Sequence, residues 1–223
     1  MDGQRSVRVA VLLLAFALAG ALGASACGGS GQDDKPTELT LGGTSEFRGV
    51  RQLPPIELPN VTLTDTEGRP FRLRERTAGK VTLLYLGYTH CPDVCPTHMA
   101  DIARALDALP ESTAAKVSVV FITTDPERDT PNVLREWLDL FDNRFVGLTG
   151  TRDEINRAQS LLGVNPASRT DLGGGNYAVN HAAFVMAFTP EDQKASLVYP
   201  AGMSWEDYAA DLRALIEEGK QPK

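Results

Sequence analysis

The sequence has few cysteines and no cluster of basic residues. Only three of its 223 residues are cysteine, and 22 lysines and arginines stand against 29 aspartates and glutamates, giving a formal net charge of −7. Because clustered basic side chains make the phosphate contacts that dominate nucleic-acid affinity, their absence excludes nucleic acid as the main partner. Internal repeats are absent too, and the length suits one well-buried core rather than two full domains.

Long apolar runs are also scarce. The longest, from Val9 to Leu22, is shorter than the about 20 residues that a membrane-spanning helix needs. Arg5 and Arg8 precede it, and the small residues Ala24-Ser25-Ala26 follow it. This order is typical of a secretory signal peptide, so residues 1–26 are expected to direct export from the cytoplasm and to be removed.

Cys27 directly follows the small residues and begins a polar, glycine-rich segment. The arrangement resembles a bacterial lipoprotein signal, in which this cysteine would be acylated and would hold the protein on the extracytoplasmic face of the cell membrane. Ala24 stands where such signals usually carry leucine, and an uncleaved helical anchor or simple secretion are the alternatives. Residues 27–55, rich in glycine, proline and polar side chains, are expected to form a flexible tether before a folded domain over 56–223.

The two remaining cysteines, Cys91 and Cys95, lie between an apolar strand pattern and a helix pattern. Free N–H groups at the start of a helix stabilise thiolates, which suit copper(I), zinc and disulfide chemistry. The common redox motif has two residues between its cysteines, whereas the three here allow both sulfurs to face one ion. A metal site and a redox-active pair are therefore both open, and a structural disulfide is the simpler alternative outside the cytoplasm.

Strand and helix patterns alternate along the rest of the chain, which implies crossover units and a largely parallel core. In order, we expect a β-hairpin over 56–63 and 71–73, a strand over 81–87, a helix from 95 to about 109, a strand over 116–123, a helix over 131–141, a strand over 144–148, a capped helix over 151–162, a loop over 164–175, an antiparallel strand pair over 177–188 and 195–199, and a final helix. This α/β order resembles a thioredoxin-like fold, with a central mixed sheet flanked by helices and an extra N-terminal β-hairpin.

Four motifs within these elements resemble the Sco/SenC family of copper chaperones. In chain order they are Tyr85-Leu86-Gly87-Tyr88-Thr89-His90-Cys91-Pro92-Asp93-Val94-Cys95-Pro96, Asp125-Pro126-Glu127-Arg128-Asp129-Thr130-Pro131, Phe145-Val146-Gly147-Leu148-Thr149-Gly150 and Tyr177-Ala178-Val179-Asn180-His181. The resemblance implies that Cys91, Cys95 and His181 bind one copper ion per domain. The family often has aspartate before this histidine, and Asn180 stands there instead, which questions any carboxylate support from that position.

The resemblance also implies a function. A membrane-tethered, extracytoplasmic metallochaperone would deliver copper to the binuclear copper centre of cytochrome c oxidase, with the copper-bearing oxidase subunit as its partner. Two thiolates stabilise copper(I), and an imidazole also tolerates copper(II), so both oxidation states become accessible. Zinc would more usually take a fourth ligand.

The alternative is a thiol–disulfide oxidoreductase that reduces cysteines of an oxidase subunit or another exported protein through Cys91 and Cys95. Against it, residues 178–189 lack the proline with which a usual thioredoxin binds its substrate. His181 separates the two functions, because a redox pair does not need it. A peroxidase is a weaker third possibility, since no separate peroxide-activating motif is visible.

Other polar residues near these motifs have simpler interpretations. His90 is expected to shape the cysteine loop rather than bind metal, because neighbouring residues of an extended chain point in opposite directions. His98, one helical turn beyond Cys95, could complete a zinc site but is expected to be a solvated helix residue. Asp93, Asp125 and Asp129 could orient the metal ligands without binding the ion themselves. The simpler interpretation is that Asp93 is a turn residue and that Asp125 and Asp129 belong to an arginine–aspartate network.

Overall fold

The computed structural model of the protein describes residues 46–222. The expected signal peptide, Cys27 and most of the expected tether lie outside these residues. Within the described part of the chain, no helix has both the length and the apolar character needed to cross a bilayer.

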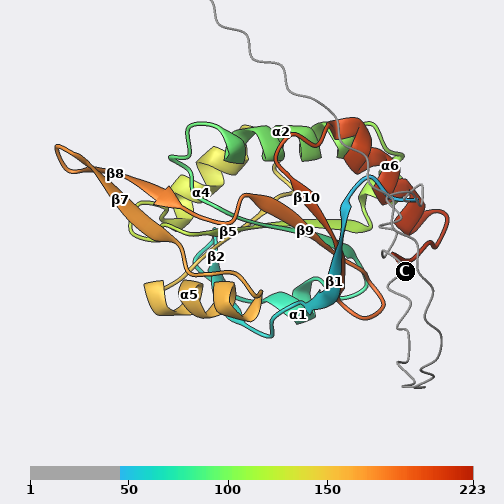
Figure 1. The fold of residues 1–223 in the computed structure, drawn as a ribbon, viewed down its shortest axis with the longest axis horizontal. Coiled ribbons are helices and arrows are strands. Elements are labelled where there is room, and N and C mark those ends of the chain that lie inside the picture. The colour runs from blue at the N-terminus through green and yellow to red at the C-terminus, as the bar shows by residue number, and fades with distance from the viewer. Residues whose placement is uncertain (1–45, 223) are drawn as a thin grey trace, which may run out of the picture. The chain divides into compact units, whose positions relative to one another are not determined.

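A mixed sheet of eight strands forms the centre of the domain (Figure 1). Across the sheet the strands are β1 (Val50–Glu57), β10 (Lys194–Pro200), β9 (Phe184–Phe188), β4 (Val81–Gly87), β5 (Val117–Thr123), β6 (Val146–Thr149), β2 (Thr62–Asp65) and β3 (Pro70–Arg72). β4, β5 and β6 are parallel, and the flanking strands pair antiparallel. The predicted thioredoxin-like fold with a central mixed sheet is confirmed.

Side chains that alternate along β4 build two separate cores. Leu83 and Tyr85 pack on one face, with α2 (Val94–Asp107), α4 (Pro131–Leu138) and α6 (Trp205–Ile216). Leu84 and Leu86 pack on the other face, with α1 (Leu73–Arg76) and α5 (Arg152–Leu161). Every residue of β4 is buried, as expected for a central strand. Helices lie on both sides of the sheet (Figure 1). The short α3 (Glu111–Ala114) leads from α2 into β5.

The N-terminal hairpin differs from the prediction in its first strand. β2 and β3 do pair antiparallel around the predicted turn, with Leu63 opposite Phe71. Ile56, however, belongs to β1, which pairs with β10 at the other edge of the sheet. β1 begins at Val50, so the ordered fold starts inside the segment predicted as tether.

The sequence pattern did not reveal β1 because most of its residues are exposed, so the strand shows no apolar alternation. Backbone contacts hold the chain in place here. Just before it, the amides of Arg48 and Gly49 each donate to the buried Asp211 carboxylate of α6 at 2.8 Å. A Cβ on Gly49 would lie 2.8 Å from the Tyr199 ring, so only glycine allows this close approach.

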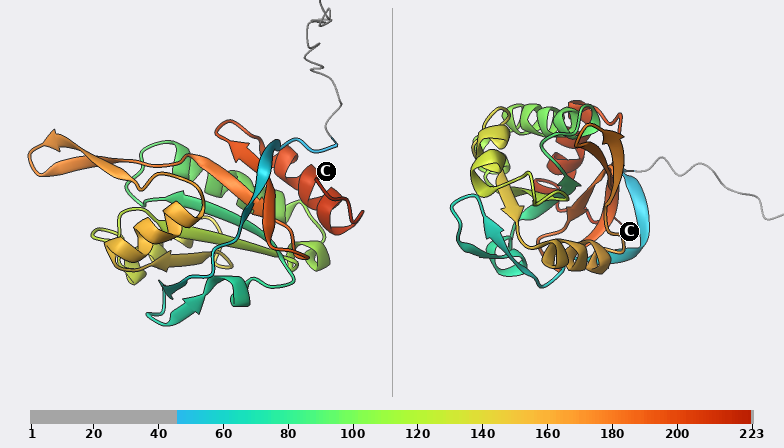
Figure 2. Two further views of the ribbon diagram at one scale, coloured as in Figure 1. Left: turned by 60° about the horizontal axis from the view of Figure 1, so that its bottom comes forward. Right: turned by 90° about the vertical axis from the view of Figure 1, so that its left-hand side faces the viewer.

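A second difference lies near the end of the chain. The segment predicted as a loop contains β7 (Ser168–Gly173), which pairs with β8 (Asn176–Asn180) to form a separate two-stranded hairpin. This hairpin projects from the body of the domain (Figure 2). The single strand predicted over 177–188 is therefore divided into β8 and β9. His181 lies in the break between them.

Candidate metal centre

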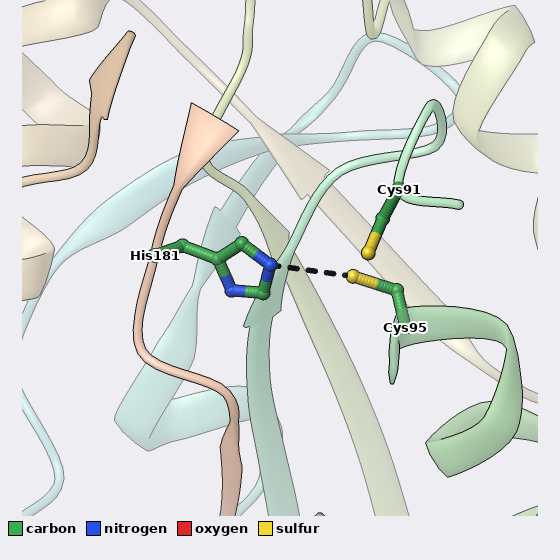
Figure 3. Close-up of side chains that lie close together, drawn as sticks. All are labelled: Cys91, Cys95 and His181. Carbon is green, nitrogen blue, oxygen red and sulfur yellow. Dashed lines mark hydrogen bonds between the residues drawn. The ribbon is translucent and has the colours of Figure 1, made fainter. Parts of the chain in front are cut away.

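The sheet topology brings the two cysteines and His181 together beyond the C-terminal end of the central strand β4 (Figure 3). Cys95 lies in the first turn of α2 and is 0% exposed, whereas Cys91 is half-buried in the loop that joins β4 to α2. β9 runs antiparallel to β4, with Val185 opposite Tyr85, so the segment before β9 reaches the place where β4 ends. His181 thus meets cysteines that are far from it in sequence.

One donor atom from each of the three side chains lies within 4.8 Å of the other two. Cys95 Sγ and His181 Nε2 are 3.6 Å apart. His181 Nδ1 lies 3.0 Å from the Ala182 carbonyl oxygen, which can only accept a hydrogen bond. Nδ1 therefore carries the proton of the neutral ring, and the Nε2 lone pair faces the sulfurs, as a metal-binding histidine requires.

Aromatic residues and one glycine fix the positions of these donors. The Tyr85 hydroxyl donates to Cys95 Sγ at 3.6 Å, and the Tyr88 ring meets the His181 ring edge-on with 5.5 Å between centroids. A Cβ on Gly87 would lie 2.9 Å from Cys95 Sγ and 2.7 Å from the Tyr85 ring. Glycine at this position therefore leaves the room that the buried sulfur occupies.

The two cysteines have opposite electrostatic environments. The pKa of Cys91 lies well below its ordinary value because hydrogen bonds with the Cys95 thiol, the His181 ring and the backbone amides of Asp93 and Cys95 outweigh the effect of burial. Burial and the neighbouring Cys91 thiolate raise the pKa of Cys95. In the metal-free protein, Cys91 is the thiolate and Cys95 holds the proton that a metal must displace.

The donor set fits copper. Thiolates favour copper(I), and a neutral imidazole suits both copper(I) and copper(II). Within residues 46–222, no other histidine, cysteine, aspartate or glutamate joins the group, whereas a structural zinc site usually has four protein ligands. Cys91 and Cys95 are free thiols in this structure, which does not contain the structural disulfide considered as an alternative.

The structure separates the remaining histidines from the donors. His90 is exposed and bonds through Nδ1 to Thr89 Oγ1 at 3.0 Å, which agrees with a role in shaping the loop. The prediction that His98 is solvated is wrong, because this residue is 2% exposed. Its Nδ1 lies 3.0 Å from the hydroxyl of Tyr208 in α6. This helix covers His98, and the sequence pattern of α2 does not indicate that contact.

The three aspartates have different positions. Asp93 is exposed next to Cys91, and its side chain does not cap α2. Asp129 is buried beneath the cysteine loop, where it accepts hydrogen bonds from the Thr89 amide at 3.0 Å and the Thr89 hydroxyl at 2.6 Å. Asp125 is buried and contacts Arg128 and two residues of the β7–β8 hairpin, Arg169 and Tyr177.

The comparisons with known proteins agree with this geometry. The SCO1/SenC family model matches residues 54–217. The chain belongs to the SCO1/SenC family. A putative copper-binding protein of Stutzerimonas stutzeri is 35% identical over 60% of this chain, and mitochondrial SCO2 of Saccharomyces cerevisiae is 36% identical over 59%. The matched parts make up 65% and 44% of those two relatives, so the chain aligns with only part of each.

Solved structures of Sco proteins have the same fold. Copper-bound ScoI of Bradyrhizobium japonicum is 34% identical, with a TM-score of 0.64 over 70% of this chain and 98% of that one. A more distant structure, BsSco, is 20% identical, with a TM-score of 0.56 over 75% of this chain and 95% of that one. BsSco is described as a member of the Sco family of cytochrome c oxidase assembly proteins.

Proposed function

We propose that this protein is a copper chaperone that holds one copper ion on Cys91, Cys95 and His181 and delivers it to the binuclear copper centre of cytochrome c oxidase. The observation that carries the proposal is the convergence of two sulfurs and one imidazole nitrogen within 4.8 Å in a SCO1/SenC protein. The copper-bound relatives support the metal, and the description of Sco proteins as oxidase assembly proteins supports the target.

The arrangement suits transfer by ligand exchange. Three protein ligands leave a side of the ion open to a donor atom of an acceptor protein, and the half-buried Cys91 gives the acceptor access. As each new bond to the acceptor forms, one bond to this protein can break, so the ion need not pass through water. Cys95 is fully buried and is therefore the ligand expected to release copper last.

Transfer can be measured directly. Residues 28–223 loaded with copper(I) should pass the ion to the metal-free copper domain of the oxidase subunit when the two are mixed and then separated. Copper that stays with residues 28–223, or that reaches the acceptor no faster than it does from copper–glutathione, would contradict the proposal.

A second candidate function is thiol–disulfide exchange, which the low pKa of Cys91 favours. The Cys91 thiolate would attack a target disulfide, form a mixed disulfide and release one target thiolate. The Cys95 sulfur would then lose its proton and attack Cys91, which releases the second target thiolate and leaves a Cys91–Cys95 disulfide. His181 is not needed for either step, so its substitution separates this function from copper delivery.

Membrane attachment through Cys27 is part of the proposal. In cells supplied with a labelled fatty acid, the wild-type protein should carry the label and a Cys27→Ser variant should not. Equal labelling of the two proteins, or none on the wild type, would instead favour an uncleaved helical anchor or secretion.

A further inference from the structure

His181 directly follows the β7–β8 hairpin, whose apolar contact with the rest of the domain comes from β8, where Val179 is buried and Tyr177 packs against the core. Every residue of β7 is exposed, and the hairpin forms a sheet of its own beside the central one (Figure 2). Its backbone pairing joins β7 to β8 but not to the body. Side chains must therefore fix the position of the end of β8 and of His181, which follows it.

One buried carboxylate contacts both strands of the hairpin. Asp125 is 0% exposed and follows β5. Arg169 of β7 contacts its Oδ1 at 2.9 Å, and the hydroxyl of Tyr177 in β8 donates to its two oxygens at 2.9 and 3.1 Å. Arg128 forms a further ion pair with it from the body of the domain. Each strand of the hairpin thus contributes a side chain to a single carboxylate.

Arg128 extends these contacts toward the metal centre. Its Nη1 donates to the Tyr177 carbonyl at 3.2 Å, and its guanidinium lies 3.7 Å from the centre of the Tyr177 ring. The same guanidinium lies 5.7 Å from the centre of the Tyr88 ring, which in turn packs against His181. His181 is therefore linked to the cluster both along the chain from β8 and through Tyr88.

The ionised form of Asp125 depends on the arginines and the tyrosine that surround it. Burial alone raises the pKa of Asp125, but hydrogen bonds from Arg128 and Tyr177 and the nearby arginines lower it below its ordinary value. A buried carboxylate interacts more strongly with its partners than an exposed one, because little water screens it. Arg169 is 40% exposed and also pairs with Glu127, so its removal weakens the link of β7 to both carboxylates, while Arg128 and Arg152 still compensate the Asp125 charge.

We propose that Asp125 is a positioning residue of the metal centre: it holds the β7–β8 hairpin through Arg169 and Tyr177, and thereby sets the place of His181 over the cysteines. The inference rests on the proposed copper function. It assigns a role to Arg169, for which the sequence shows no pattern. It also implies that His181 can be displaced without moving the cysteines, whose positions are set by β4 and α2.

Arg169→Ala is the variant that tests this role. Arg144→Ala is its matched control, since Arg144 is similarly exposed and pairs with Asp142 and Asp107, away from the hairpin. Copper(II) affinity is measured by competition with a chelator, in the wild-type background and in a His181→Ala background. We expect Arg169→Ala to weaken copper(II) binding about tenfold, as loss of a supporting residue commonly does, and Arg144→Ala to change it less than about twofold.

In the His181→Ala background, Arg169→Ala should cause no further loss, because the ligand it positions is already gone. In the metal-free protein, Arg169→Ala should also shift the imidazole NMR signals of His181, which are simple to assign in a chain with three histidines.

Two results would overturn the inference. One is an Arg169→Ala protein whose copper(II) affinity equals that of the wild type. The other is an equal loss of affinity with and without His181, which would show that the effect does not pass through this ligand. Failure of the proposed function is distinguishable from both, because wild-type copper(II) binding would then not depend on His181 at all.

Discussion

A Cys91→Ser protein is expected to lose tight copper binding completely. Copper has only two thiolates in the described domain, and a hydroxyl stays protonated and binds copper(I) poorly. The loss should exceed the roughly 10- to 100-fold effect of changing a supporting residue. Copper(I) affinity by competition, and the thiolate-to-copper(II) absorption of the oxidised complex, both measure it.

Cys91→Ser is cleaner than Cys95→Ser because Cys91 is half-buried, whereas a hydroxyl in place of Cys95 would be fully buried beside Tyr85. Both variants should nevertheless lose the absorption band. Unchanged thermal unfolding of Cys91→Ser would show that the fold persists. One copper per domain with the wild-type spectrum in either variant would remove the two-thiolate site.

A His181→Ala protein is expected to bind copper(II) poorly while it keeps its dithiol chemistry. The imidazole is the ligand that best suits copper(II), whereas disulfide exchange needs only the two sulfurs. The protein should therefore still form a reducible Cys91–Cys95 disulfide. The variant loses the contribution of His181 to the low pKa of Cys91 but keeps the larger one of the Cys95 thiol and those of the nearby amides, so Cys91 should still be alkylated nearly as fast at pH 6 as at pH 8. An ordinary thiol would slow roughly 80-fold over this interval.

His90→Ala is the matched control for this variant, because His90 is an imidazole next to Cys91 that lies outside the donor group. It should bind copper(II) like the wild type. In a strain lacking the protein under copper limitation, His90→Ala should restore oxidase activity and His181→Ala should not. If His181→Ala restores it fully and shows the wild-type copper spectrum, thiol–disulfide exchange becomes the leading function.

The local parts of the fold were predictable from sequence. The continuous apolar pattern of β4 and the spacing of Met99, Ile102 and Leu106 in α2 each record burial against the core. The capping box of α5, with Thr151 and Glu154, is also present as predicted. Such patterns are visible because each side chain reports its own surroundings.

The parts that the sequence did not reveal depend on contacts between distant residues. β1 and β7 are mostly exposed, so their pairing leaves no apolar alternation. Arg169 reaches Asp125 across 44 positions of sequence, and nothing near either residue indicates the other. His98 looks like a surface residue of α2 until α6 is placed over it.

The same distinction applies to the metal centre. The spacing of Cys91 and Cys95 indicates by itself that the two sulfurs act together, as ligands of one ion or as a redox pair, because the two residues are close in the chain. His181 is 86 residues beyond Cys95, and only the resemblance to a known family selected it. The pairing of β9 with β4 explains why His181 lies near the cysteines, since it returns the chain to the end of β4, from which the cysteine loop leaves.

The most direct test of the central claim is X-ray absorption at the copper edge of residues 28–223 loaded with one equivalent of copper(I). The ion should be surrounded by two sulfur atoms and one imidazole nitrogen, which correspond to Cys91, Cys95 and His181. A copper ion with only nitrogen and oxygen neighbours, or with sulfur neighbours and no imidazole, would contradict the three-ligand centre.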